Sequence, residues 1–373
     1  MLLFSPRMRL NRDGLCLLKS LLCFLLFCPL AALAGERPFP NLAAIGSSNV
    51  EGAENPQFTP VLFFDYQSPG DPLNFTLKSA SLDLKWRNPQ GNFYFGPSVR
   101  AGWLAEGEPE QIIVWQKRQL PLTFWGHSLQ AGLLLGREWA GDLSLELEGV
   151  RRQYFFGNID NTGDSLRLPA NFNENRFSLR LDWDQEEDAG WGWRLRSLAE
   201  QINRDQWEAW SLEEAVENSQ RMLSRLDLAW KGSPAWESKL TLRHAQGREL
   251  DFFNALLVGG LAGDIPLGGY YRNEFRAQGV SQGEVTQSIP LNAQGAKVSF
   301  IAQGARVQIW ENPLYDEMEP SYSLTSAGVG LYYPIQSLDG LPVILSYFEG
   351  LSRPQGFPEG KRSEIMILLV AGW

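Results

Sequence analysis

The stretch from Arg176 to Asp184 reads Arg-Phe-Ser-Leu-Arg-Leu-Asp-Trp-Asp, so charged or polar residues alternate with apolar ones. Side chains point to opposite faces along a β-strand, and this segment would therefore carry one apolar and one charged face. Similar alternation recurs over residues 143–148, 225–230 and 236–243. A soluble β-sandwich with its apolar face inward has this pattern, and so does a membrane barrel with its apolar face in lipid. The rest of the sequence favours the barrel.

Residues 1–34 resemble a secretory signal peptide. Their first part carries four basic residues, Arg7, Arg9, Arg12 and Lys19. An apolar core over 21–30 and the small-x-small site Ala32-Leu33-Ala34 follow. A membrane anchor is the alternative, but the apolar run is short for a spanning helix and Pro29 interrupts it. We therefore expect export, with cleavage before Gly35.

The cysteines and the charge balance narrow the class of protein further. All three cysteines lie before residue 35, so the expected mature chain has no disulfide, thiolate metal site or cysteine nucleophile. Removing four of the 33 basic residues and one of the 43 acidic residues leaves 29 and 42, a net charge of −13. This balance argues against nucleic acid as a partner and against a basic membrane-surface module.

The hydropathy and the tryptophans fit a barrel in a membrane. No later stretch of the sequence approaches the length of an apolar spanning helix. All 14 tryptophans follow residue 34, often near the ends of expected strands, and amphipathic rings collect at bilayer interfaces. A tryptophan-rich carbohydrate-binding sandwich is the rival interpretation.

Strand-like runs follow one another almost to the end of the chain. We expect 15 of them, at 59–67, 74–86, 92–104, 111–118, 121–137, 141–155, 174–185, 190–200, 219–230, 236–247, 276–291, 296–310, 321–335, 341–352 and 363–373. Single-chain bacterial barrels have an even number, so one strand is missed or split, and the doubtful part is where 111–118 adjoins 121–137. The predicted fold is all-β: a transmembrane antiparallel barrel of about 16 strands over 59–373, after a loose periplasmic lead-in over 35–58.

The connections between these strands fall into two classes. The short ones, typical of periplasmic turns, are 184–190, 231–235, 291–295 and 336–340. The longer ones, expected outside the cell, are 156–173, 201–218, 248–275, 311–320 and 353–362. The two classes alternate over the second half of the chain, as a barrel requires.

The last expected strand ends the chain on an aromatic residue. One face of this strand would carry Ile367, Leu369, Ala371 and the terminal Trp373. This resembles the C-terminal sorting signal of outer-membrane barrels, in which Phe is the usual last residue. A buried edge strand is the alternative. The sorting signal implies barrel-assembly machinery as a partner during biogenesis.

Three motifs occur in order from about residue 141. Tyr154–Thr162 resembles a Phe-Gly-x-Gly-Asn extracellular loop, and Ala327–Ile335 resembles an antepenultimate strand. Between them, Leu257–Gly260 and Leu267–Tyr270 resemble a Gly-Gly…Leu-Arg-Gly-Tyr loop. These motifs resemble the bacterial surface antigen superfamily, which includes the barrels of BamA and TamA, two-partner secretion pores and patatin-like outer-membrane proteins. The resemblance implies a loop that folds into the lumen around Gly259, Gly260, Gly268, Gly269 and Tyr270.

The chain departs from the family pattern in two places. Gly268 stands where the loop Arg would be, and in relatives that Arg pairs with lumen acids. We therefore expect the loop to sit differently or to be held by Arg272 or Arg276. Only about 24 residues separate the cleavage site from the first expected strand, which leaves no room for POTRA receptor domains and argues against a full insertase role.

Charged residues lie on one face of several expected strands. They are Glu146, Glu148, Arg176, Arg180, Asp182, Arg194, Arg196, Arg225, Asp227, Lys239 and Arg243. Charges in lipid are costly, so we expect these residues to line a wet lumen. Their mixed signs favour salt-bridge ladders over the strip of one sign that a selective pore would show.

Catalytic and metal-binding patterns are weak. His127 and His244 are the only histidines, and His127 and Ser128 would point to opposite faces of a strand, which argues against a Ser–His lipid hydrolase. The oxygens of Asp160, Asn161 and Asp164 lack EF-hand spacing and fit turn chemistry. We expect neither enzyme activity nor a cofactor or metal.

The predicted location is the bacterial outer membrane, with its lipid around the barrel. By resemblance, the function is that of a membrane-embedded component in protein insertion, assembly or secretion, with a separate periplasmic protein as a partner. A passive channel or porin for small solutes is the alternative, and a lipid-modifying barrel enzyme is a third hypothesis.

Overall fold

A computed structural model describes nineteen segments of the chain. They are 41–49, 58–67, 73–78, 81–87, 92–103, 113–114, 117–118, 125–139, 142–157, 171–186, 190–205, 216–231, 236–250, 254–260, 264–270, 275–309, 321–335, 341–352 and 362–371. The regular structure within these segments is β-strand. They contain no helix long and apolar enough to cross a membrane.

The first strands are β1 (Asn41–Asn49), β2 (Phe58–Gln67), β3 (Leu73–Lys78), β4 (Ser81–Arg87), β5 (Phe93–Trp103), β6 (Ile113–Val114), β7 (Lys117–Arg118), β8 (Trp125–Trp139), β9 (Leu143–Gly157) and β10 (Phe172–Glu186). The later strands are β11 (Trp191–Asp205), β12 (Asn218–Lys231), β13 (Glu237–Arg248), β14 (Leu256–Val258), β15 (Phe275–Pro290), β16 (Lys297–Ile309), β17 (Ser321–Ile335), β18 (Leu341–Gly350) and β19 (Arg362–Ala371).

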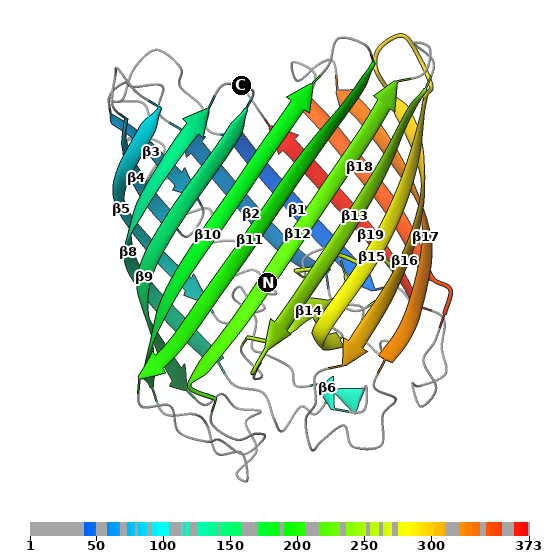
Figure 1. Ribbon diagram of the computed structural model, residues 1–373. Coiled ribbons are helices and arrows are strands. Elements are labelled where there is room, and N and C mark those ends of the chain that lie inside the picture. Colours follow the sequence, from blue (N-terminus) through cyan, green and yellow to red (C-terminus); the bar gives the residue numbers. More distant parts are fainter. Residues whose placement is uncertain are drawn as a thin grey trace, which may run out of the picture.

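The pairing of these strands closes a ring (Figure 1). Of the 17 strands in the main sheet, β14 pairs only with β15, and the other sixteen described strands each pair with two ring neighbours. The ring passes directly from β13 to β15. It closes where β19 pairs with β1, from Leu42 opposite Ala371 to Asn49 opposite Glu364. The pairs are antiparallel throughout, as in up-and-down membrane barrels.

The register separates an apolar face from a polar one. Leu179 lies opposite Leu147 and Ala199, while the neighbouring Arg180 lies opposite Glu146. The apolar face is exposed, with Leu133 70% and Phe177 59% accessible. A soluble sandwich would bury this face. Large apolar side chains are exposed on this face of each ring strand from β5 to β18. Such exposure indicates a lipid-facing exterior.

One turn shows how the sequence sets a short connection. Between β15 and β16, Asn292 Oδ1 accepts hydrogen bonds from the backbone N–H of Gln294 (3.1 Å) and of Ala296 (3.0 Å). Gly295 has a φ of 90°, which glycine adopts without steric cost. Leu291 N–H and Ala296 C=O close the loop at 2.7 Å. The hydrogen bonds of Asn292 and the positive φ of Gly295 therefore reverse the chain between β15 and β16.

Three of the strand predictions are wrong. Residues 41–49, predicted as part of a loose lead-in, form β1, because pairing to β2 and β19 on both sides compensates for a weakly alternating sequence. The predicted strand 74–86 is two strands, β3 and β4. The predicted strand 111–118 is absent from the ring, and its described residues form the separate β6–β7 pair. Together these changes turn the 15 expected strands into the sixteen described in the ring.

Leu133 provides a test of the exterior face. It lies near the middle of β8 and is 70% exposed. Leu133→Arg is expected to destabilise the folded barrel in lipid by about 2–4 kcal/mol, because a charge near the bilayer midplane is poorly solvated. Urea unfolding in lipid vesicles measures this difference. Leu133→Phe is the matched control and should change little. Equal stability of both variants would contradict a lipid-facing position.

Candidate functional site

A segment of the long connection between β13 and β15 folds into the barrel. We call its described residues, 254–260 and 264–270, the plug segment. Its strand β14 pairs with the first residues of β15, with Leu256 opposite Ala277. The chain then turns back on itself, with Ile265 N–H donating to Leu257 C=O at 3.1 Å and Leu267 N–H to Gly260 C=O at 2.9 Å. The segment therefore satisfies part of its own backbone, as a buried segment must.

Two glycines seat the plug segment against the wall. Gly268 N–H donates to Gln303 Oε1 at 2.9 Å, and Gly269 N–H donates to Glu364 Oε2 at 3.2 Å. Gly269 has a φ of 79°, and a Cβ on it would overlap the backbone of Glu349 and Gly350. Only glycine allows this approach at Gly269. Backbone amides therefore contact the polar groups of the wall here, where the motif that this loop resembles has Arg at the position of Gly268.

Tyr270 anchors the end of the plug segment. Its hydroxyl lies 2.9 Å from the Ser352 carbonyl oxygen and 3.0 Å from that of Thr325. The ring is 2% exposed and packs edge-on against Phe275 at a centroid distance of 5.9 Å. These contacts, with the glycine amides, hold the loop. Of the two arginines expected to hold it, Arg272 lies outside the described residues, and Arg276 lies opposite Leu257 in the β14–β15 pair.

The plug segment shares an apolar core with the barrel wall. Such a core is unusual inside a barrel, where polar side chains commonly face water. The wall residues come from six strands, β9, β10, β13, β15, β16 and β17. The buried core consists of Tyr154, Phe172, Ala245, Leu250, Ala255, Leu256, Val258, Ile265, Leu267, Tyr270, Phe275, Ala277, Val280, Ala305, Val307, Tyr322 and Leu324. Burial of this surface stabilises the inward position of the segment.

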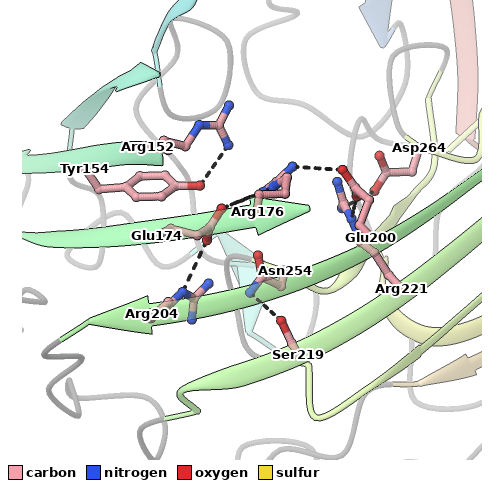
Figure 2. A network of polar contacts seen from close by, with 10 residues as sticks. All are labelled: Arg152, Tyr154, Glu174, Arg176, Glu200, Arg204, Ser219, Arg221, Asn254 and Asp264. Carbon is pink, nitrogen blue, oxygen red and sulfur yellow. Dashed lines mark hydrogen bonds and ion pairs between the residues drawn. The ribbon is translucent and has the colours of Figure 1, made fainter. Parts of the chain in front are cut away.

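A chain of buried charges borders this core (Figure 2). Glu174 accepts from Arg176 Nη2 at 2.8 Å and from Arg204 Nε at 3.4 Å, and the Glu174 and Arg204 side chains are fully buried. Arg176 also pairs with Glu200 at 3.3 Å, and Glu200 pairs in turn with Arg221. Each buried acid therefore lies between two guanidinium groups, which is the compensation that buried charges need.

Two contacts join this chain of charges to the plug segment. Arg221 Nη1 lies 3.8 Å from Asp264 Oδ2, and Asn254 Nδ2 donates to Ser219 Oγ at 3.0 Å. Both wall residues belong to β12. Figure 2 shows Asp264 and Arg221 turned toward each other beside Glu200. The plug segment is thus tied to β12 on one side and to β19, through Glu364, on the other.

No protein-family model matches the sequence, and no curated protein matches it significantly. Solved structures do match. The chain is similar to CdiB from Acinetobacter baumannii (TM-score 0.57, 13% identity, 89% of this chain and 60% of that one) and to CdiB from Escherichia coli (0.54, 12%, 90% and 64%). It is also similar to a structure of Haemophilus ducreyi BamA lacking POTRA domains 1–3 (0.53, 10%, 90% and 71%).

The chain has the outer-membrane β-barrel fold of these CdiB and BamA structures. At these identities the likeness concerns the fold, and the chain spans 60% of the length of the Acinetobacter CdiB chain. The apolar exterior of the described strands fits the outer-membrane location of such barrels.

The predicted lining residues lie on the face of the barrel wall that contacts the plug segment. Most form pairs of opposite charge: Arg180–Glu146 (3.3 Å), Arg194–Asp182 (3.1 Å), Arg196–Asp182 (3.8 Å), Arg225–Asp227 (2.7 Å), Lys239–Asp227 (3.4 Å) and Arg243–Glu284 (3.1 Å). Arg176 belongs to the buried chain of charges, and Glu148 accepts from Ser98 Oγ at 2.9 Å. Charges of opposite sign are therefore paired on neighbouring positions and strands of this face.

Sequence reasoning missed part of the buried chain of charges. Glu174, Glu200 and Arg221 fall inside predicted strands at inward positions, so the alternation rule could have found them. Arg204 lies beyond the predicted end of its strand at residue 200, and β11 continues to Asp205. The degree of their burial, complete for the side chains of Glu174 and Arg204, has no signal in the sequence, because it depends on the plug segment and on neighbouring strands.

The remaining predicted positions are placed as follows. Ile367, Leu369 and Ala371 lie in β19, opposite Leu345, Val343 and Leu42, whereas Trp373 lies outside the described residues, so the sorting signal stays a prediction.

His127 lies in β8 opposite Trp103 and Phe155, and the side chain of Ser128 is buried. His244 Nδ1 lies 3.0 Å from Ser281 Oγ on the outer face. The segment with Asp160 lies outside the described residues, which hold no cluster of three or more potential metal ligands.

Proposed function

We propose that this protein is a membrane-embedded component of protein insertion, assembly or secretion in a bacterial outer membrane. One observation carries the proposal: a folded plug segment crosses the lumen from Ser219 on β12 to Glu364 on β19. The fold is the one found in BamA and CdiB structures, which supports the same class of function. A separate periplasmic protein is proposed as its partner, and no enzymatic step is proposed.

The plug segment argues against constant passage of solutes. Its side chains Leu256, Val258 and Leu267 are completely buried and belong to the apolar core shared with the wall. Opening would require loss of an apolar core together with the hydrogen bonds of Gly268 and Gly269. Such a lumen suits a polypeptide pathway that opens only when a polypeptide to be inserted or exported binds to the barrel.

A passive channel for small solutes is the second candidate. The observation that favours it lies toward the short-turn end of the barrel, where the side chains of Arg180 and Arg196 are 50% and 42% exposed. These charges indicate a wet vestibule. Their acidic partners, Glu146 and Asp182, leave it with mixed signs and no strip of one charge for ion selectivity.

Planar-bilayer conductance distinguishes the two candidates. The proposed function predicts small, flickering currents for the intact barrel, because the plug segment crosses the lumen and obstructs it. Deleting residues 257–272 should convert these currents into large, steady openings. Large, steady openings from the intact protein would favour the passive channel. Deletion without any change in conductance would remove the plug hypothesis.

Site-specific cross-linking tests the proposed role directly. A photoreactive residue placed at Arg180 faces the wet part of the lumen. In native outer membranes, we expect it to cross-link to unfolded or exported polypeptides. The same probe at Leu133, on the exterior, is the control. A lumen probe that captures no polypeptide, in a protein that conducts small solutes, would contradict the proposal.

A further inference from the structure

A groove crosses the outer surface of the barrel from β5 to β13. Its volume is about 930 Å³, within the range of roughly 300–1,000 Å³ that small-molecule sites occupy. It follows two rows of outward side chains that lie side by side across the strands. One row runs through Phe95, Leu135, Leu147, Leu179, Ala199, Met222 and Gln246. The other runs through Leu133, Gly149, Phe177, Gln201, Gln220 and Arg248.

Small residues near the middle of these two rows explain why the surface forms a groove there. Gly149 has no side chain, and Ala199 lies between Leu179 and Met222 in its row. The larger residues Leu133 and Phe177 stand out on either side of Gly149, at 70% and 59% exposure. A long apolar chain could lie in such a depression against side chains, where it gains close dispersion contacts.

The character of the groove changes along its length. On β5 to β10 its outward lining is apolar, whereas on β11 to β13 it becomes polar at Gln201, Gln220 and Arg248. Gln220 Nε2 donates to Gln201 Oε1 at 2.7 Å. Arg248 makes no hydrogen bond or ion pair with any other residue that the structure describes. Amide and guanidinium groups are costly against hydrocarbon and favourable against a phosphorylated, hydroxylated headgroup.

The polar end of the groove lies at the end of the barrel that carries the long connections. Arg248 is the last residue of β13, and Gln220 is the third residue of β12. Leu133, at the apolar end, lies near the middle of β8. Long connections of outer-membrane barrels face outside the cell, so the polar end is at the level of the outer-leaflet headgroups.

We propose that this groove binds a phosphorylated glycolipid of the outer leaflet. Its acyl chains lie along Leu133, Phe177 and Leu179, and its headgroup contacts Gln220 and Arg248. The orientation follows from the order of apolar and polar residues along the groove. This site does not depend on the proposed function, since it lies outside the lumen.

Native mass spectrometry of the full barrel, titrated with lipid A, tests this site. We expect the wild type to retain lipid A in preference to phosphatidylglycerol. Ala199→Trp fills the groove and should lose most of the bound lipid A, and Gly149→Leu is a second filling variant. Arg248→Gln should weaken lipid A retention and abolish the preference over phosphatidylglycerol.

Ala302→Trp on β16 is the matched control, because Ala302 also faces outward and is exposed. It should retain lipid A as the wild type does. Heat-dependent gel migration shows whether each variant is folded. Undiminished lipid A retention by a folded groove-filling variant, or equal retention of both lipids by the wild type, would mean non-specific boundary lipid and would overturn the proposal.

Discussion

Gly269→Val should release the plug segment and raise the conductance of the barrel several-fold. Gly269 has a φ of 79°, a region in which a β-branched residue is strongly disfavoured. Any Cβ there would also overlap the backbone of Glu349 and Gly350. The segment must move away from β18, and the hydrogen bond from Gly269 N–H to Glu364 is then lost. Planar-bilayer recording should show longer and larger openings than the wild type.

Gly304→Ala is the control for this experiment. Gly304 lies on β16, and a Cβ added there meets no atom within 4 Å. It should leave the conductance unchanged and the barrel folded. If folded Gly269→Val kept the small currents of the wild type, the contacts of Gly268 and Gly269 with the wall would not be what keeps the plug segment in the lumen.

Glu174→Gln is expected to cost about 3–5 kcal/mol of barrel stability, since it removes the acid that compensates two buried guanidinium groups. Arg204 and Glu174 have fully buried side chains, and Arg176 is largely buried beside them. Glutamine has nearly the same shape as glutamate, so the loss reports charge compensation rather than packing. Urea unfolding in lipid vesicles, followed by heat-dependent gel migration, measures the change in unfolding free energy.

The ion pair between Arg151 and Asp205 supplies the control for this second experiment. Its atoms are 3.2 Å apart, but the side chains are 60% and 46% exposed. Asp205→Asn should change the stability by only about 0–1 kcal/mol, because both side chains are exposed and Asp205 ends β11 beside a long connection, away from the buried interior. Similar losses for Glu174→Gln and Asp205→Asn would show that burial of the Glu174 cluster does not determine its contribution.

Gly269→Val and Glu174→Gln distinguish the contribution of the plug segment from that of the barrel wall that supports it. Gly269 contacts β18 and β19, whereas Glu174 lies on β10, several strands away. Gly269→Val should therefore change conductance more than unfolding. Glu174→Gln should lower stability, and it should affect conductance only through the contact between Arg221 and Asp264.

The local alternation in the sequence determined which face of each strand is apolar. This rule places Leu179 and Arg180 on opposite faces, as the register does, and it places Arg180, Glu146, Arg194 and Asp182 on one face. Which of these charges pair with which is seen only in the structure. The rule succeeds because side-chain direction in a strand depends only on the position along that strand. The Asn and Gly residues of turns such as 291–296 are local signals of the same kind.

Contacts between residues far apart in the chain could be seen only in the tertiary structure. Residues 41–49 alternate weakly, and their strand exists because β2 and β19 both pair with it. Gly268 appeared as a departure from a motif and Gly269 as a match to it, yet the role of both depends on how closely β18, Gln303 and Glu364 approach them. Burial of Arg204 depends likewise on Glu174 and on the core packed by the plug segment. The physical reason is that periodicity is a property of one strand, whereas burial and close approach are properties of several strands together.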